Sequence, residues 1–238
     1  MALVTANKKN LILVSGRAHP QLAQDVAKEL DSELLETEAR TFANGEIYAR
    51  FGESVRGADA FVIQSHTHPI NEWLMEQLIM VDALKRLGVT DVISVSACGS
   101  FRAEMAPGDF VIIDQFIDRT FARDKSFFGT GCVAHVSVAH PTCERLSDAA
   151  EQAAKSAGIT VHRGGTYLCM EGPQFSSIAE SKMYRDSWGC DVIGMTNMPE
   201  AKLAREAELC YASVAMITDY DSWHPEHGAV DISDILAT

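Results

Sequence analysis

Short runs of β-branched residues alternate with segments whose apolar positions recur every three to four residues. The β-branched runs predict strands at 11–15, 47–51, 60–65, 91–97, 109–117, 133–138, 166–170, 191–196 and 211–220. The helical periodicity predicts helices at 19–30, 71–87, 143–157, 177–188 and 200–209, with Asn71 as an N-cap. Such alternation is typical of an α/β fold whose helices cover both faces of the sheet. We therefore expect a mixed central β-sheet flanked by helices.

Length and charge limit the classes of protein to which the chain can belong. No Pro/Gly-rich linker divides the 238 residues, so we expect one α/β domain over 1–238. The net charge of −13 argues against a nucleic-acid partner, which requires basic surface. No apolar run approaches the roughly 18–20 residues that span a bilayer. The start of the sequence does not fit a signal peptide, so we expect a cytoplasmic protein without a membrane partner.

The cysteines show no metal-binding or disulfide pattern. Six of them are scattered along the chain, and none forms a C-x-x-C pair. Paired spacing is typical of metal sites, and disulfide frameworks belong to small secreted chains. We therefore expect reduced, mostly buried thiols and no bound metal.

Two carboxylates follow the last predicted strand, in the segment T-D-Y-D-S-W at 218–223. Because side chains alternate along a strand, Asp219 and Asp221 should point to one side and Tyr220 to the other. Two close carboxylates repel, so one of them tends to hold a proton near neutral pH. A protonated and an ionised carboxyl group match adenine, which accepts a hydrogen bond at N7 and donates one at N6. A solvated acidic turn and a metal site remain alternatives.

Three other strand ends carry residues suited to a ligand. In the segment 170–177, glycine and proline force a turn before a helix, and Phe175 is placed either to stack on a base or to plug the core. In 194–200, Thr196 precedes a helix start, where anions bind favourably. The segment 96–102 is rich in small residues whose backbone amides could meet phosphate. The ends of strands in α/β sheets are the usual place for ligands.

These segments resemble the methylthioadenosine phosphorylases of the purine nucleoside phosphorylase family. The resemblance covers about 87–238 and is carried by S-A-C-G-S-F-R-A-E-M-A-P-G-D-F, G-T-Y-L-C-M-E-G-P-Q-F-S-S, D-V-I-G-M-T-N-M-P-E and T-D-Y-D-S-W. It implies a nucleoside-phosphorylase fold, a trimer, a purine nucleoside and inorganic phosphate as substrates, and no metal or organic cofactor.

The resemblance also implies a role for each matching residue. Asp219 would protonate or hydrogen-bond N7 of the leaving adenine, and Asp221 would bind its amino group. The nucleoside would further contact Phe175, Ser176, Met195 and, across a subunit interface, His135. Phosphate would contact Ser96, Ala97 and Thr196.

Residues 1–86 instead resemble the start of ribose-phosphate pyrophosphokinases, through F-A-N-G-E-I-Y-A-R-F and W-L-M-E-Q-L-I-M-V-D-A-L-K-R. We expect this segment to take the same place in the sheet as the corresponding part of a phosphorylase. The Gly-Gly-Thr-Gly-like phosphate loop and the Arg-His pair of the phosphorylases are replaced by V-S-G-R and Ser65-His66. Ser15, Arg17 and His66 are the candidate substitutes for phosphate binding, although Arg17 could simply face solvent. Since the sequence ends at 238, the family's final helix is also expected to be missing.

Three functions follow as alternatives. The first is phosphorolysis of methylthioadenosine, weakened by the atypical phosphate site. The second is a binding-only or inactive purine-nucleoside-binding fusion protein. The third, a pyrophosphokinase-like transferase, lacks the acidic ribose-phosphate loop and the basic catalytic loop of that family.

Overall fold

The chain divides into two compact units, residues 1–90 and 91–238. The computed structural model describes residues 11–225, apart from 56–57, 66–68, 87 and 130. The division falls close to position 87, where the two sequence resemblances meet. The assignment of 1–238 to one domain and the place of the first segment in the sheet both remain predictions.

The first unit consists of a small parallel sheet, a hairpin and two helices. The sheet has the order β2-β1-β5, and β3 pairs antiparallel with β4. The helix α1 begins after His19, whose side chain accepts a hydrogen bond from the backbone of Leu22 (2.9 Å). The helix α2 begins at Ile70, so the prediction of Asn71 as its N-cap is wrong. The elements are β1 (Leu11–Ser15), α1 (Pro20–Glu29), β2 (Leu34–Leu35), β3 (Thr37–Thr41), β4 (Ile47–Phe51), β5 (Asp59–Ile63) and α2 (Ile70–Arg86).

The second unit contains a mixed seven-stranded sheet with the order β8-β10-β11-β6-β12-β7-β9. Its strands are β6 (Asp91–Ser100), β7 (Phe110–Ile113), β8 (Gln115–Arg119), β9 (Val161–Arg163), β10 (Thr166–Met170), β11 (Val192–Gly194) and β12 (Cys210–Tyr220). Its helices are α3 (Glu144–Ser156), α4 (Ile178–Lys182), which continues as a π-helical turn (Met183–Ser187), and α5 (Glu200–Glu206). This mixed sheet with flanking helices confirms the predicted fold class.

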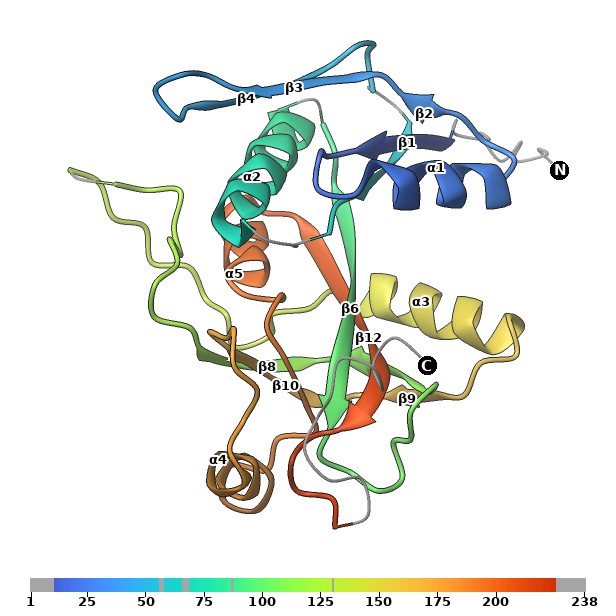
Figure 1. Cartoon of the computed structure of the whole chain (residues 1–238), viewed down its shortest axis with the longest axis vertical. Coiled ribbons are helices and arrows are strands. Elements are labelled where there is room, and N and C mark those ends of the chain that lie inside the picture. Colours follow the sequence, from blue (N-terminus) through green and yellow to red (C-terminus); the bar gives the residue numbers. More distant parts are fainter. Residues whose placement is uncertain (1–10, 56–57, 66–68, 87, 130, 226–238) are drawn as a thin grey trace, which may run out of the picture. The chain divides into compact units, whose positions relative to one another are not determined.

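The parallel strands β6 and β12 form the centre of this sheet, and α3 and α5 both pack on β12 from opposite sides of the pair (Figure 1). The pairing runs from Cys210 beside Asp91 to Tyr220 beside Ser100, with an irregularity between Ile217 and Asp219. The largest fully buried side chains of this unit include Tyr167, Tyr211, Phe101, Ile112, Leu168 and Ile217. The sheet thus rests on an aromatic and aliphatic core.

The predicted strand 109–117 is two strands. It breaks at Asp114, whose carboxylate accepts a hydrogen bond from the backbone of Gly165 (3.1 Å). β7 and β8 lie near opposite ends of the strand order, yet only Asp114 separates them. Because one residue spans less than about 8 Å between its neighbours, the sheet must be strongly coiled to bring its two sides together.

The predicted strand 133–138 does not form, although its valines have high β propensity. Val133 is 76% exposed, and Val136 and Val138 are also exposed. A strand requires hydrogen-bonding partners along its backbone, and the described part of the chain gives this segment no neighbouring strand. Propensity was therefore overridden by the lack of a partner.

The expectation that all cysteines are reduced is wrong, because Cys143 and Cys210 form a disulfide. Cys143 is the N-cap of α3, and its backbone N–H donates to the carbonyl of Tyr211 (2.7 Å). This hydrogen bond joins the two segments, and the Cα atoms of the cysteines are 5.3 Å apart. Of the free cysteines, Cys98, Cys169 and Cys190 are buried and Cys132 is exposed.

Within the described ranges, none of the helices combines the length and apolar character that crossing a membrane would require. Nor do the described residues group three His, Cys, Asp or Glu side chains in a way that could hold a metal ion.

Candidate functional site

The two predicted carboxylates meet at Gly99 near the end of β6. A Cβ atom placed on Gly99 would lie 2.8 Å from Asp219 Oδ1 and 3.4 Å from Asp221 Cβ. Asp219, in β12, and Asp221, directly after it, therefore approach the same point, as alternation predicted. Tyr220 points elsewhere, since its hydroxyl donates to the carbonyl of Ala103 (3.2 Å). Only glycine leaves room for this approach.

Asp221 is the more enclosed member of the pair. Its side chain is 3% exposed, and one of its carboxylate oxygens, Oδ2, has no hydrogen-bond partner. Burial raises the pKa of Asp221 above its ordinary value, and the nearby charge of Asp219 adds to the effect. The sequence predicted that one carboxyl group holds a proton more readily than usual, and in the structure this group is Asp221. A buried oxygen without a partner is matched to a ligand that donates a hydrogen bond.

Two predicted phosphate ligands also lie together. The hydroxyls of Ser96 and Thr196 are 2.6 Å apart, and Ser96 Oγ lies 3.1 Å from the hydroxyl of the fully buried Tyr167. Ala97, the next residue of β6, is exposed, and its carbonyl accepts from Ser96 Oγ (3.3 Å). Tyr167 was not predicted; it reaches this place because Gly194 leaves the space that a Cβ would fill.

The spacing along β6 relates the hydroxyl pair to the carboxylate pair. Ser96 and Gly99 are three residues apart on this strand, which corresponds to about 10 Å. A purine at Asp219 and Asp221 and a phosphate at Ser96 and Thr196 would thus lie at two ends of one stretch of backbone. The two pairs thus share one strand, although positions three apart on it face opposite sides of the sheet.

The turn after β10 supplies the remaining predicted contacts. A Cβ on Gly172 would lie 2.5 Å from the sulfur of Met195, so the glycine lets Met195 pack directly over the turn. Phe175 is 40% exposed and therefore does not plug the core. Ser176 is buried, and its carbonyl accepts a hydrogen bond from Ser222 (2.9 Å), which ties the turn to the segment after Asp221.

Arg123 is a residue of this region that sequence reasoning missed. Its guanidinium donates to the backbone carbonyls of Met195 (2.6 Å), Met198 and Glu171 (3.0 Å). Its position in an irregular segment after β8 carries no periodic signal. The arginine within R-T-F-A-R was the only available indication.

The predicted substitutes for phosphate binding lie in the first unit. Arg17 donates through its backbone N–H (2.7 Å) and Nε (2.6 Å) to the fully buried Glu76, and through Nη2 to Thr41 and Glu72. It is therefore not simply solvent-facing, and these carboxylates already neutralise its charge, which disfavours its use by phosphate. Ser15 Oγ donates to the carbonyl of Gly16 (2.7 Å). His66 lies outside the described residues.

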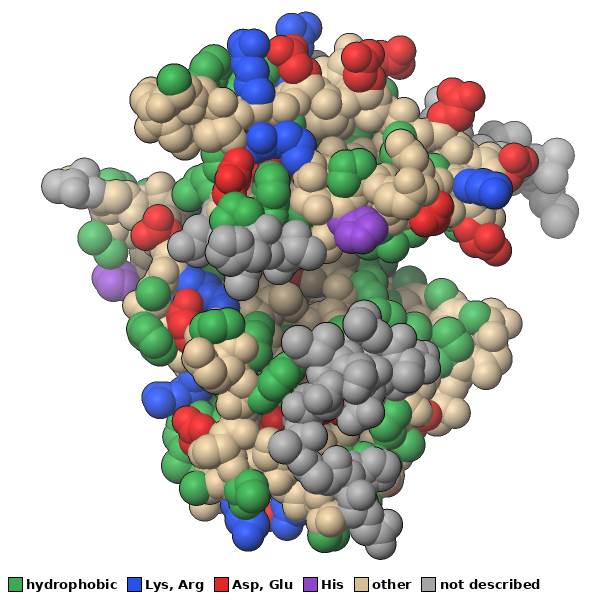
Figure 2. Space-filling model, viewed as in Figure 1, with side chains coloured by type: hydrophobic (Ala, Val, Ile, Leu, Met, Phe, Trp, Pro, Cys, Tyr) green, Lys and Arg blue, Asp and Glu red, His purple; other side chains and the backbone are tan. Residues whose placement is uncertain are grey.

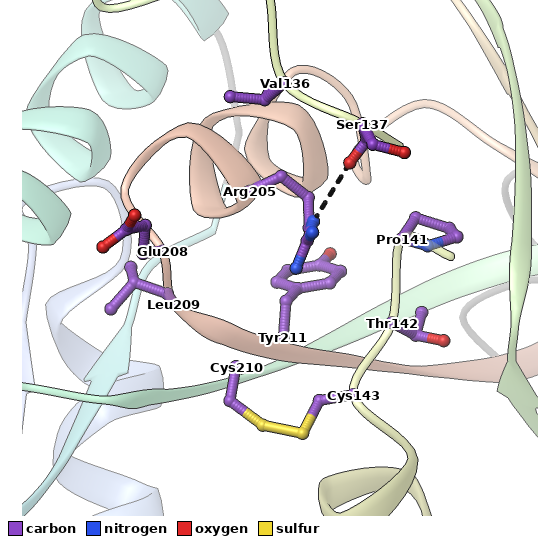
Figure 3. Close-up of a pocket in the computed structure, with 10 residues that line it drawn as sticks. All are labelled: Val136, Ser137, Pro141, Thr142, Cys143, Arg205, Glu208, Leu209, Cys210 and Tyr211. Atoms are coloured by element: carbon purple, nitrogen blue, oxygen red, sulfur yellow. Dashed lines mark hydrogen bonds between the residues drawn. A yellow bond between two sulfur atoms is a disulfide. The ribbon is translucent and has the colours of Figure 1, made fainter. Parts of the chain in front are cut away.

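His135 is exposed in the irregular segment between β8 and α3. The same segment lines a cavity of about 500 Å³ together with the start of β12 (Figure 3). In this cavity the side chain of Arg205 extends to the carbonyl of Ser137, and the Cys143–Cys210 disulfide forms part of the wall. Since Cys210 begins β12 and Asp219 is near its other end, the cavity and the carboxylate pair are separate. We place the candidate site along the last residues of β6, which hold both the carboxylates and the hydroxyl pair.

Comparison with known proteins shows similarity to one family. A family model described as the phosphorylase superfamily matches residues 13–237. Over 158 residues the chain is 78% identical to S-methyl-5′-thioadenosine phosphorylase of Cereibacter sphaeroides. The matched region makes up 66% of this chain and 54% of that protein. The enzyme of the same name from Bradyrhizobium diazoefficiens is 65% identical over 156 residues, covering 66% and 53%. The chain thus spans about half the length of the curated relatives it matches.

Solved structures extend the similarity to nearly the whole chain. Methylthioadenosine phosphorylase from Schistosoma mansoni in complex with adenine has a TM-score of 0.75 at 29% identity, covering 97% of this chain and 85% of that chain. A methylthioadenosine phosphorylase from an antarctic soil metagenomic library has a TM-score of 0.73 at 36% identity, covering 96% and 79%. These similarities confirm the predicted resemblance to methylthioadenosine phosphorylases. The resemblance of 1–86 to pyrophosphokinases remains a prediction.

Proposed function

Because the chain belongs to the phosphorylase superfamily, we propose that it catalyses the phosphorolysis of 5′-methylthioadenosine to adenine and 5-methylthioribose 1-phosphate. The observation that carries this proposal is the approach of Asp219 and Asp221 to Gly99, on the strand that also holds the Ser96–Thr196 hydroxyl pair. The names of the relatives from Cereibacter sphaeroides and Bradyrhizobium diazoefficiens support the choice of methylthioadenosine.

In the proposed reaction a phosphate oxygen bonds to C1′ of the sugar as the bond from C1′ to N9 of adenine breaks. The sugar passes through an oxocarbenium-like state, and the electron pair of the broken bond moves into the purine. Asp219 protonates or hydrogen-bonds N7, while Asp221 accepts from the exocyclic amine. The unpartnered oxygen of Asp221 supports its role as a hydrogen-bonding partner of adenine. Its raised pKa favours the protonated form, however, so the direction of this shift does not support Asp219 as the proton-holding member of the pair. Positioned hydrogen bonds supply most of the acceleration.

The sugar and the phosphate lie between the turn after β10 and the end of β11 in this proposal. Met195 contacts the ribose, and Phe175 and Ser176 lie against the nucleoside. Ser96, Ala97 and Thr196 bind phosphate, with Ser15, Arg17 and His66 as further candidates from the first unit. Inorganic phosphate is the co-substrate, and the reaction uses no metal or organic cofactor.

We further propose a cytoplasmic homotrimer in which His135 of one subunit reaches toward the nucleoside of its neighbour. The exposed position of His135 supports this role. Neither nucleic acid nor membrane is a partner in the proposal. The net charge of −13 supports the exclusion of nucleic acid, as do the interspersed basic and acidic side chains over the first unit in Figure 2.

A second candidate is a purine-nucleoside-binding protein with little turnover. The contacts of Arg17 favour it, because its charge is already compensated by Glu72 and Glu76. Loss of one preorganised donor can reduce a rate by about 10²–10³. A pyrophosphokinase-like transferase is less favoured.

The test is adenine release from methylthioadenosine, measured with and without phosphate. We expect phosphate-dependent release that falls at least about 100-fold in Asp219→Asn, because the proton donor to N7 is lost. Asp148→Asn, which alters an exposed carboxylate paired with Arg163, should retain the wild-type rate. Adenine binding without release by the wild type would favour the second candidate. ATP-dependent consumption of ribose 5-phosphate would favour the transferase.

A further inference from the structure

Arg123 joins three connections that follow different strands of the second unit. Its side chain is 10% exposed and lies in the connection after β8. Nη1 donates to the carbonyls of Met195 (2.6 Å) and Met198, both in the connection after β11. Nη2 donates to the carbonyls of Met170 (3.4 Å) and Glu171 (3.0 Å), at the end of β10 and just beyond it. One guanidinium thus binds two chain segments at once.

Glu171 makes the reciprocal connection. Its carboxylate accepts from Arg123 Nε (3.3 Å) and from the backbone N–H groups of Phe121 (2.7 Å) and Ala122 (3.2 Å). Burial alone would raise the pKa of Glu171, but the two backbone N–H groups and Arg123 lower it overall, so the carboxylate remains ionised. Arg123 therefore binds the backbone beside Glu171, and Glu171 binds the backbone beside Arg123. We call this pair the Arg123–Glu171 clamp.

The clamp acts on the backbone that presents the sugar and phosphate contacts. The carbonyl of Met195 that it binds belongs to the residue whose side chain packs over Gly172. Thr196 follows directly, with its hydroxyl 2.6 Å from Ser96. Asp219 and Asp221, by contrast, lie at the end of β12 and directly after it, and neither is among the hydrogen-bond partners described for Arg123. The clamp is thus linked to one end of the site and not to the other.

We propose that Arg123 is a positioning residue for the sugar and phosphate end of the site, acting through the backbone of Met195 and Thr196 and supported by Glu171. This inference rests on the proposed function. The planar guanidinium presents five donors in a fixed fork, whereas lysine has a single charged nitrogen on a flexible stem. Arg123→Lys keeps the charge but cannot bind both segments in the same geometry.

The test compares adenine with methylthioadenosine and phosphate, because only the last two would reach the sugar and phosphate end of the site, where the Arg123–Glu171 clamp acts. We expect Arg123→Lys to bind adenine within about 2-fold of the wild type, because adenine depends on Asp219 and Asp221. Its KM values for methylthioadenosine and for phosphate should each rise by about 10-fold or more. Glu171→Gln should change the same constants in the same direction by a smaller factor, and it provides a second variant if Arg123→Lys does not fold. Arg163→Lys, an exposed arginine paired with Asp148, is the matched control and should resemble the wild type.

Each outcome separates the clamp from the proposed function. Unchanged KM values in an active Arg123→Lys variant would overturn the positioning role and leave the proposed function intact. An equal loss of adenine and methylthioadenosine binding would show that Arg123 only maintains the fold. A wild type that neither binds adenine nor releases it would remove the proposed function, and the clamp with it.

Discussion

Gly99 shows how one residue without a side chain makes room for the carboxylate pair at the proposed purine end of the site. It lies where Asp219 and Asp221 approach β6, and the φ angle it adopts is not one that demands glycine. The requirement is therefore for space. The same reasoning applies to Gly194 beside Tyr167, whereas Gly172 beneath Met195 combines the need for space with a φ of +70° that favours glycine. At each position the missing Cβ lets a functional or supporting side chain come close.

Gly99→Ala tests this requirement. Its Cβ would lie 2.8 Å from Asp219 Oδ1, so the carboxylate must move. We expect adenine affinity, measured by calorimetric titration, to fall by about 10-fold or more while the protein stays folded. Gly129→Ala is the control, because nothing lies within 4 Å of its added methyl group. Wild-type adenine affinity in Gly99→Ala would contradict the proposed position of the purine.

Asp221 should make stability depend on pH. Its pKa in the fold is raised above 3.8, mainly by burial, so the folded state holds its proton more tightly than the unfolded state. The contribution of Asp221 to stability is therefore greatest at low pH and decreases as the pH rises above 3.8 through the raised pKa. In Asp221→Asn this dependence is absent. Thermal unfolding of both proteins across that pH range should show the wild type losing stability relative to the variant as the pH rises; a constant difference would contradict the assignment.

At the scale of elements, the disulfide joins the start of α3 to the start of β12 across 67 residues of sequence. Closing a loop of this length restricts the unfolded chain, which in the chain-entropy account stabilises the fold by about 4 kcal/mol. The bond lies at the end of β12 away from Asp219 and Asp221. The disulfide should therefore affect the stability of the fold and not the carboxylate pair.

Reduction of the disulfide should lower the melting temperature by roughly 10 °C, given about 2–4 °C per kcal/mol for a chain of this size. The measurement is thermal unfolding with and without dithiothreitol. The double variant Cys143→Ser, Cys210→Ser should melt near the reduced protein and show no response to the reductant. An identical melting temperature for the reduced and oxidised wild type would mean that the bond does not stabilise the fold.

At the scale of the whole molecule, the segment 121–138 exposes several apolar side chains, which the fold of a single chain does not explain. Phe121 is 82% exposed and Val133 76% exposed, and Phe127, Phe128, Val136 and Val138 are exposed as well. Apolar side chains grouped on a surface are typical of an interface. A second copy of the chain would also supply the neighbouring strand that 133–138 lacks among the described residues. The proposed trimer accounts for both observations.

Val133→Asp should therefore dissociate the trimer. The added charge would be buried without a partner in the assembled protein, at a cost that exceeds the contribution of a single valine. Light scattering should give about three times 26.0 kDa for the wild type and one chain mass for the variant. Ile178→Asp, an exposed apolar residue of α4, is the control and should remain trimeric. A wild type that stays monomeric at high concentration would contradict the proposal.

The sequence by itself determined the fold class, most of the helices and strands, and the carboxylate pair of Asp219 and Asp221. These features depend on local periodicity and on alternation along a strand, which can be read over a few residues. The family resemblance added the assignment of the strand ends to a nucleoside and phosphate. The spacing of the two residues also predicted a raised pKa for one carboxyl group, but through repulsion, whereas burial is its main cause in the structure.

Only the tertiary structure decided which carboxyl group has the raised pKa, where Arg123 binds, and how Cys143 pairs with Cys210. It also divided 109–117 into β7 and β8 and left 133–138 without a strand. Each of these depends on contacts between residues far apart in the sequence: burial around Asp221, carbonyls from two other connections around Arg123, and a backbone hydrogen bond between Cys143 and Tyr211. No local pattern encodes such contacts, because they arise only when the coiled sheet brings its strand ends together.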